Sequence, residues 1–137
     1  MSKQANINAL QQFGEAVNSR NLSKLNDLVA PDSIDHDPAP GQAAGPEGYI
    51  KFFNMIQTAF PDLKIDVEHL VADDECVAFA YTMTGTHEGD FMGVAATHNN
   101  IKARGMQISK FENGKMVERW GSSDELGILK QLGVTLS

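Results

Sequence analysis

An imidazole lies between two carboxylates in the sequence Asp35-His36-Asp37. This combination of side chains could transfer a proton. A carboxylate beside a histidine can orient the ring and tune it for proton transfer near neutral pH. Adjacent residues of an extended chain point in opposite directions, so only one of Asp35 and His36 is expected to face a pocket. The alternative is a hydrogen-bonded loop anchor. Asp35 and His36 are therefore candidate catalytic residues.

A second group with chemical potential lies around residue 90. His87, Glu88, Asp90 and His98 are all side-chain types that bind divalent ions. No two of the histidines have a recognised metal-binding spacing, such as positions i and i+4 of a helix. The sequence therefore predicts no metal site. His87, at the end of an expected strand, is a candidate ligand-binding residue.

Length and charge limit what the chain can do. Its 137 residues are enough for one hydrophobic core, and we expect a single domain over residues 1–137. The net charge of -7 disfavours nucleic acid and anionic membranes as partners. No apolar run approaches the roughly 20 residues that cross a bilayer. The lone Cys76, and the absence of an apolar stretch after Met1–Gln4, favour the cytoplasm.

Three helices are expected before residue 62. The first follows the apolar spacing of Ile7, Leu10, Phe13 and Val17 and should end near residues 18–21. A second, shorter helix has leucines at 22, 25 and 28 with Val29 on one face, and Pro31 should end it. Residues 32–45 are expected to be irregular. The third helix opens at Pro46, ends at Pro61 and carries an aromatic stripe that includes Tyr49, Phe52, Phe53 and Phe60.

From Leu63 onward the apolar period changes to two, which indicates strands. Residues 77–87 have large side chains on one face and small ones on the other, as in a central strand with room for a ligand. Residues 88–100 are expected to form a loop or edge at a pocket mouth. Strands at 101–111 and 115–121 flank Asn113-Gly114, a strong type I′ hairpin signal.

After the hairpin, Ser122 and Glu125 have the spacing of a capping box, so a last helix is expected to run to Gly133. The order is three helices, about four antiparallel strands and a final helix, which indicates the α+β class. A bent sheet with helices in its concavity forms a cone whose open end is a common place for a small-molecule pocket.

Six fragments, taken in this order, resemble the SnoaL-like polyketide cyclases of the nuclear-transport-factor-2-like superfamily. They are His36-Asp37-Pro38, Ala59-Phe60-Pro61-Asp62-Leu63, Gly85-Thr86-His87, Phe91-Met92-Gly93, the hairpin from Phe111 to Glu118 with Trp120, and Leu126-Gly127-Ile128-Leu129 with Gln131-Leu132-Gly133. The resemblance covers nearly the whole chain.

The resemblance implies a cone-shaped pocket and an intramolecular aldol ring closure that needs no metal or cofactor. In the characterised cyclases an acidic residue removes a proton next to a carbonyl, and its position falls on Gly121 here; a helper histidine falls on Gln107. Neither replacement can transfer a proton, so the reaction does not carry over residue by residue. Gln107 is expected to face the pocket as a ligand-binding residue, and Arg104 to face the opposite way.

The remaining candidates each have two interpretations. Asp124, three residues beyond Gly121, is either a replacement acid/base or a carboxylate that stabilises the positive end of the last helix. Tyr81 and Phe60 either contact a ligand or only fill the core. Met92 belongs to the expected pocket mouth, and Trp120 either covers the pocket or seals a subunit interface.

The predicted function is binding of a small hydrophobic carbonyl compound, with cofactor-free cyclisation or isomerisation as the enzymatic hypothesis. The alternative is a non-catalytic ligand-binding or dimerisation module that has lost the acid/base pair. The family also leads us to expect a homodimer or a higher homo-oligomer, with dimerisation through the outer face of the sheet. An inward carboxylate or histidine with a displaced pKa would favour the enzyme.

Overall fold

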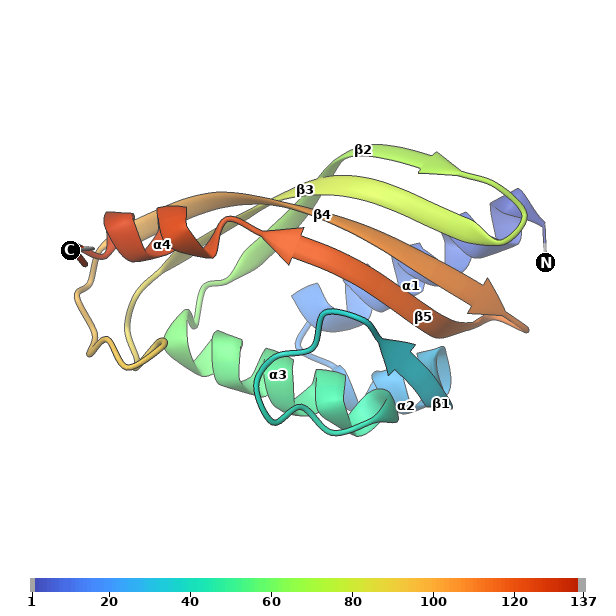
Figure 1. Ribbon diagram of the computed structural model, residues 1–137, viewed down its shortest axis with the longest axis horizontal. Helices are drawn as coiled ribbons and strands as arrows, with labels where there is room; N and C mark the ends of the chain where they lie inside the picture. The colour runs from blue at the N-terminus through green and yellow to red at the C-terminus, as the bar shows by residue number, and fades with distance from the viewer. Residues whose placement is uncertain (1, 136–137) are drawn as a thin grey trace.

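The computed structural model describes residues 2–135 and shows one curved, unclosed sheet with helices packed on its concave face (Figure 1). Along the chain the elements are α1 Lys3–Asn18, a 3-10 turn Leu22–Lys24, α2 Leu25–Leu28, β1 Val29–Asp35, α3 Gly45–Ala59, β2 Lys64–Ala72, β3 Cys76–Thr86, β4 Asn100–Glu112, β5 Lys115–Ser123 and α4 Glu125–Gln131. The expected α+β fold is confirmed.

The sheet has the strand order β1-β5-β4-β3-β2. Strands β2 to β5 are paired antiparallel, as predicted, and β3 is an interior strand between β2 and β4. The predicted hairpin is also confirmed. Asn113 and Gly114 have φ angles of 53° and 79°, the left-handed values that a type I′ turn requires.

Strand β1 was not predicted, because Pro31 and the polar residues after it indicated an irregular segment. Val29, expected at the end of the second helix, instead opens a strand that pairs parallel with β5. Pro31 is tolerated in β1 for two reasons. The strand is at the edge of the sheet, and Pro31 lies where the pairing register shifts between Val29 and Ile34, so that its lack of a backbone N–H does not interrupt the pairing with β5.

The capping-box prediction for the last helix was also wrong. Ser122 lies within β5, and α4 begins at Glu125 with Asp124 as its N-cap. The antiparallel ladder extends further than the hydrophobic pattern indicated, because Ser122 still pairs with Met106 of β4. The helix therefore starts two residues later than a Ser122 cap would place it.

Two apolar clusters fill the space between the sheet and the helices. One joins α1, α2, β1 and the neighbouring ends of β3 to β5, and includes Leu25, Val29 and Met116. The other joins the end of α3 to β3, β4 and α4, and includes Phe60 and Ile128. Within residues 2–135, no helix has the length and apolar character needed to span a membrane.

Candidate functional site

Gln107 and Gly121 are direct cross-strand partners on β4 and β5. Alternate residues of β4 on either side of Gln107 are buried, including Gly105 and Ser109, so this face of the sheet packs toward the helices. The two positions at which the cyclase pattern is broken are therefore neighbours on the inner face. Arg119, two residues before Gly121, lies on the same face.

Arg119 is held in place by two other inner side chains. Its Nη1 donates to both carboxylate oxygens of Asp35, at 2.9 and 3.2 Å, and its Nε donates to Oε1 of Gln107 at 2.8 Å. The side chains of Arg119 and Asp35 are only 19% and 8% exposed. Gln107 also donates from Nε2 to the hydroxyl of Ser109 at 2.9 Å. Beside positions 107 and 121, where the family's helper histidine and acid fall, this protein therefore has a guanidinium in a fixed position.

The carboxylate of Asp35 is occupied on both oxygens. Besides Arg119, it accepts from Nε2 of Gln42 at 3.0 Å and from the backbone N–H of Asp37 at 3.0 Å. These bonds tie the β1–α3 loop to the sheet and fit the loop-anchor interpretation. Both oxygens of Asp35 are therefore engaged by donors that the protein itself supplies.

The absence of a side chain at position 121 makes room for the guanidinium. A Cβ atom there would lie 2.5 Å from Nη2 and 2.8 Å from Cζ of Arg119. Arg119 therefore occupies the space into which the family's acidic side chain would project. Its Nη2 has no hydrogen-bond partner among residues 2–135 and is not fully buried.

A second glycine on the inner face is covered by Tyr81. A Cβ atom at Gly105 would overlap the Tyr81 phenol, whose ring therefore lies across β4. Burial raises the pKa of Tyr81, the Arg119 charge opposes that shift, and Glu125 adds to it. The hydroxyl has no hydrogen-bond partner in the described chain, so at neutral pH it is an available donor.

Tyr49 of α3 lies deeper, beside Asp35. Burial is the main cause of its raised pKa, and the negative charge of Asp35 adds to the shift. Its hydroxyl and that of Ser33 are buried without a hydrogen-bond partner at normal geometry. Tyr49 belongs to the first apolar cluster.

His36 and Trp120 lie on the outer face and do not join this site. Their rings stack at 4.6 Å with an interplanar angle of 6°, and Nε2 of His36 lies 3.1 Å from Oε1 of Glu118. Asp35 and His36 therefore point in opposite directions, as strand geometry requires. Trp120 pairs with Ile108, another outer-face residue.

Asp124, Met92 and Arg104 are also outside the inner site. The Asp124 carboxylate accepts from the backbone N–H of Gly127 at 2.8 Å, which is the helix-capping interpretation. Met92 is 58% exposed in the loop between β3 and β4. Arg104 lies 3.8 Å from Glu68, with its side chain 62% exposed, and is on the opposite face to Gln107 as expected.

Phe60 and His87 are completely buried next to each other. Their ring centroids are 5.5 Å apart, and Phe91 packs on Phe60 at 5.2 Å. Nδ1 of His87 accepts from the backbone N–H of Thr97 at 3.1 Å, while its buried Nε2 has no hydrogen-bond partner in the described part of the chain. In this structure both residues are part of the packed interior. No group of three or more potential metal ligands occurs in residues 2–135.

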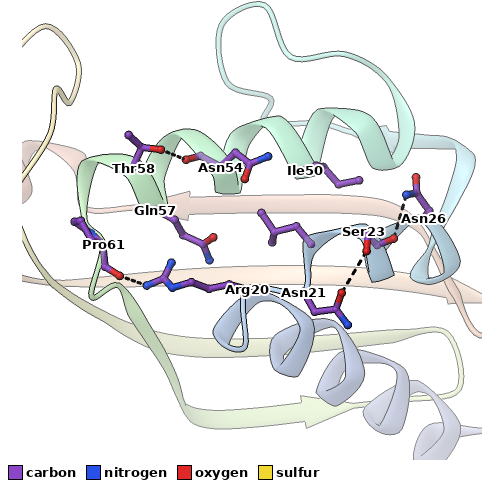
Figure 2. Close-up of a pocket in the computed structure, with 10 residues that line it drawn as sticks. Arg20, Asn21, Ser23, Asn26, Ile50, Asn54, Gln57, Thr58 and Pro61 are labelled. Carbon is purple, nitrogen blue, oxygen red and sulfur yellow. Dashed lines mark hydrogen bonds between the residues drawn. The ribbon is translucent and has the colours of Figure 1, made fainter.

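A pocket lies elsewhere, on the helical side of the molecule (Figure 2). It is a groove of about 740 Å³ between the end of α1 and α3. Figure 2 shows amide and hydroxyl side chains around it, with Arg20 donating to the carbonyl of Pro61. Gln57 donates to the carbonyl of Val17 at 2.9 Å. Much of its polar lining is therefore already paired within the protein.

A smaller pocket of about 130 Å³ lies beside the β1–α3 loop. Neither it nor the groove includes any site residue predicted from the sequence, and neither reaches the sheet. The inner face is nevertheless partly open to solvent. Phe79, Tyr81, Gln107, Arg119 and Gly121 all have intermediate exposure.

Arg119 is the site residue that sequence reasoning missed. The signal was present, because the alternation that placed Gly121 on the inner face also places Arg119 there. Its partner Asp35 is 84 residues away and lies on a strand that was not predicted. The guanidinium could therefore not be assigned to a partner from the pattern alone.

The curved sheet with helices in its concavity and a polar inner face defines a nuclear-transport-factor-2-like roll. The sequence pattern of the family described as SnoaL-like polyketide cyclase matches residues 7–132. The chain therefore belongs to the SnoaL-like polyketide cyclase family. A search of curated proteins found no match.

Several solved structures share the fold. IdmH from Streptomyces antibioticus, described as a candidate polyketide cyclase, is 31% identical, with a TM-score of 0.82 and coverage of 94% of this chain and 99% of that one. AclR from Streptomyces galilaeus, described as a candidate hydroxylase, is 27% identical, with a TM-score of 0.84 and coverage of 96% and 98%. TsrD from Streptomyces laurentii has a TM-score of 0.89 at 21% identity, covering 98% and 99%, and supports the fold alone.

Proposed function

We propose that the protein binds a small, largely apolar carbonyl compound on the inner face of its sheet, at Arg119, Tyr81 and Gln107. The observation that carries this proposal is a pair of inner-face donors that have no hydrogen-bond partner among residues 2–135, Nη2 of Arg119 and the Tyr81 hydroxyl. Phe79 and Tyr81 are in ring contact at 5.9 Å, and Tyr81 packs against the second apolar cluster. An apolar body with one carbonyl oxygen matches such a surface.

The surface groove is a weaker candidate for this ligand. Arg20 is the only titratable residue among those that line it, and the Arg20 guanidinium is bound to a backbone carbonyl. Its lining offers polar contacts but no acid or base. Family membership favours the inner face, because the positions of the cyclase acid and its helper, 121 and 107, lie there.

Binding is tested with 2-acetylnaphthalene and with 2-ethylnaphthalene, which has nearly the same shape but no carbonyl. We expect the ketone to bind more tightly, because only its oxygen can accept from Arg119 and Tyr81. In two-dimensional NMR the ketone should shift the Arg119 Nε–H and Gln107 side-chain amide signals. An Asn54→Ala variant in the groove serves as the control and should bind equally well. Perturbations confined to Asn54 and Gln57 would contradict the proposal.

Whether the site also catalyses proton transfer is a separate question. The non-catalytic alternative is favoured by the engagement of Asp35 with Arg119, of His36 with Trp120 and of Asp124 with α4. The enzymatic hypothesis is favoured by Tyr81, a neutral phenol suited to donate a proton to a carbonyl oxygen.

Deuterium exchange separates the two alternatives. Proton removal from the methyl group of 2-acetylnaphthalene gives an enolate, and return of a deuteron from D₂O labels that carbon. Faster labelling with the protein than with buffer, and its loss in Tyr81→Phe, would support acid/base chemistry. Labelling at the buffer rate despite binding would make the protein a ligand-binding module.

We also propose a homodimer formed through the outer face of the sheet, as expected for the family. Val71, Met106 and Ile108 are 57%, 59% and 43% exposed on β2 and β4, and Trp120 lies beside Ile108. Such an apolar surface on one side of a sheet is suited to self-association.

Location in the cytoplasm stays a prediction, which was made in part from the single cysteine, Cys76.

A further inference from the structure

The inner face contains two backbone positions without side chains, Gly105 and Gly121, on neighbouring strands. Because Gln107 pairs with Gly121, the two glycines are diagonal neighbours across β4 and β5. Each is covered by a polar side chain that comes from elsewhere: Tyr81 lies over Gly105, and Arg119 lies over Gly121. The phenol is also near enough to the guanidinium for the Arg119 charge to affect it.

The position of Nη2 of Arg119 is fixed by the hydrogen bonds that the other two guanidinium nitrogens make. Nε is engaged with Gln107 and Nη1 with Asp35, so both the position and the orientation of the planar guanidinium are determined. Within residues 2–135, Nη2, the nitrogen nearest to Gly121, is the one whose N–H groups have no partner. In this arrangement Asp35 and Gln107 are positioning residues for Arg119.

We infer that Nη2 of Arg119 and the Tyr81 hydroxyl together form an oxyanion site, which binds the enolate oxygen of a ligand in preference to a neutral carbonyl oxygen. This inference rests on the proposed function. It specifies that the ligand is an enolisable carbonyl compound, such as an aryl 1,3-diketone. Donors that are already oriented bind a developing negative charge without further reorganisation.

Negative charges around the site oppose the binding of an anion. Whether an enolate binds depends on how close its oxygen lies to these charges and to the two donors. Asp35 contacts the Nη1 side of Arg119, and Asp37 accepts from the backbone N–H of Gly121 at 2.8 Å. Glu125 acts on Tyr81 through its charge. An enolate oxygen would contact Nη2 and the phenol directly, and hydrogen bonds to a charged acceptor are roughly twice as strong as neutral ones.

The probe is 1-phenyl-1,3-butanedione, whose neutral and enolate forms differ in ultraviolet absorption. Its ionisation midpoint is measured free in buffer and bound to saturating protein. We expect at least a tenfold preference of the site for the enolate, which lowers the midpoint of the bound diketone by about one pH unit. The proton released goes to the buffer, so no co-reactant is needed.

Three variants and one control make the result specific. Tyr81→Phe removes a hydroxyl that makes no hydrogen bond with the described residues, and should move the midpoint back toward the value in buffer. Arg119→Gln should do so more completely, with Arg119→Lys restoring part of the effect. Asn54→Ala, in the surface groove, should leave the midpoint of the bound diketone unchanged.

The two proposals can fail separately. If 2-acetylnaphthalene and the diketone both bind on the inner face but the midpoint does not fall, the oxyanion site is wrong and the binding site stands. A lowered midpoint that survives in Tyr81→Phe and Arg119→Gln also overturns the oxyanion site. If neither compound binds, the proposed function fails, and the oxyanion site fails with it.

Discussion

At the scale of single residues, the ion pair between Asp35 and Arg119 is the feature on which the inner site depends. Asp35→Asn removes one charge from a pair that is largely shielded from solvent. We expect it to lower the free energy of unfolding by on the order of 3 kcal/mol, because the remaining guanidinium is left partly buried without a counter-charge.

A double-mutant cycle in urea checks this expectation. Arg119→Gln alone should be destabilising as well, but the double variant should cost less than the sum of the two single changes, since it leaves no unpaired charge. Strict additivity would mean that the two side chains do not interact in solution.

Tyr49 predicts how stability changes at alkaline pH. Its pKa is raised in the folded protein by burial and by Asp35, so the folded state keeps the phenolic proton where the unfolded chain loses it. Above pH about 10, the unfolded state therefore binds fewer protons, and the free energy of unfolding falls as the pH rises.

Tyr49→Phe should weaken this alkaline loss, as measured by urea unfolding at several pH values. At neutral pH the variant should be about as stable as the parent, because the hydroxyl that it removes makes no hydrogen bond of normal geometry with the described residues. Equal slopes for the two proteins above pH 10 would exclude Tyr49 as a source of the pH dependence.

At the scale of elements, α4 depends on its N-cap. Asp124→Ala removes the acceptor for the Gly127 N–H and should lower the free energy of unfolding by about 1 kcal/mol. Ser122→Ala is the matched control: Ser122 lies in β5, so its hydroxyl is not expected to cap the helix. A larger effect at Ser122 than at Asp124 in thermal unfolding would reverse the assignment of the cap.

At the scale of the whole molecule, the two faces of the sheet have different roles. The concave face holds the core and the candidate site, while the convex face exposes Met106, Ile108 and Val71. We predict that Met106→Asp converts the proposed homodimer into a monomer in sedimentation equilibrium, because the substitution places a charge in the apolar interface.

Met55→Asp provides the comparison, since Met55 is 52% exposed on α3 and lies away from the convex face. This variant should have the same oligomeric state as the parent. Dissociation by Met55→Asp but not by Met106→Asp would place the interface on the helical side instead.

The sequence by itself determined the features that depend on neighbouring residues. Asn113-Gly114 predicted the hairpin because the left-handed conformation is a local property of those residues. The period-two pattern from residue 63 predicted the strands, and the apolar spacing of α1 and α3 predicted helices. The resemblance to the family pointed to positions 107 and 121, where its acid and helper histidine fall, and the structure places these positions side by side.

The tertiary structure decided which side chains share a site. Asp35 reaches Arg119 only because β1 pairs with β5, and that pairing joins segments 84 residues apart. The same extended backbone turns His36 to the outer face. Local periodicity carries no information about such partners, because a long-range ion pair depends on how elements pack. The missing side chain at Gly121 was visible in the sequence, but the guanidinium that occupies its space was not.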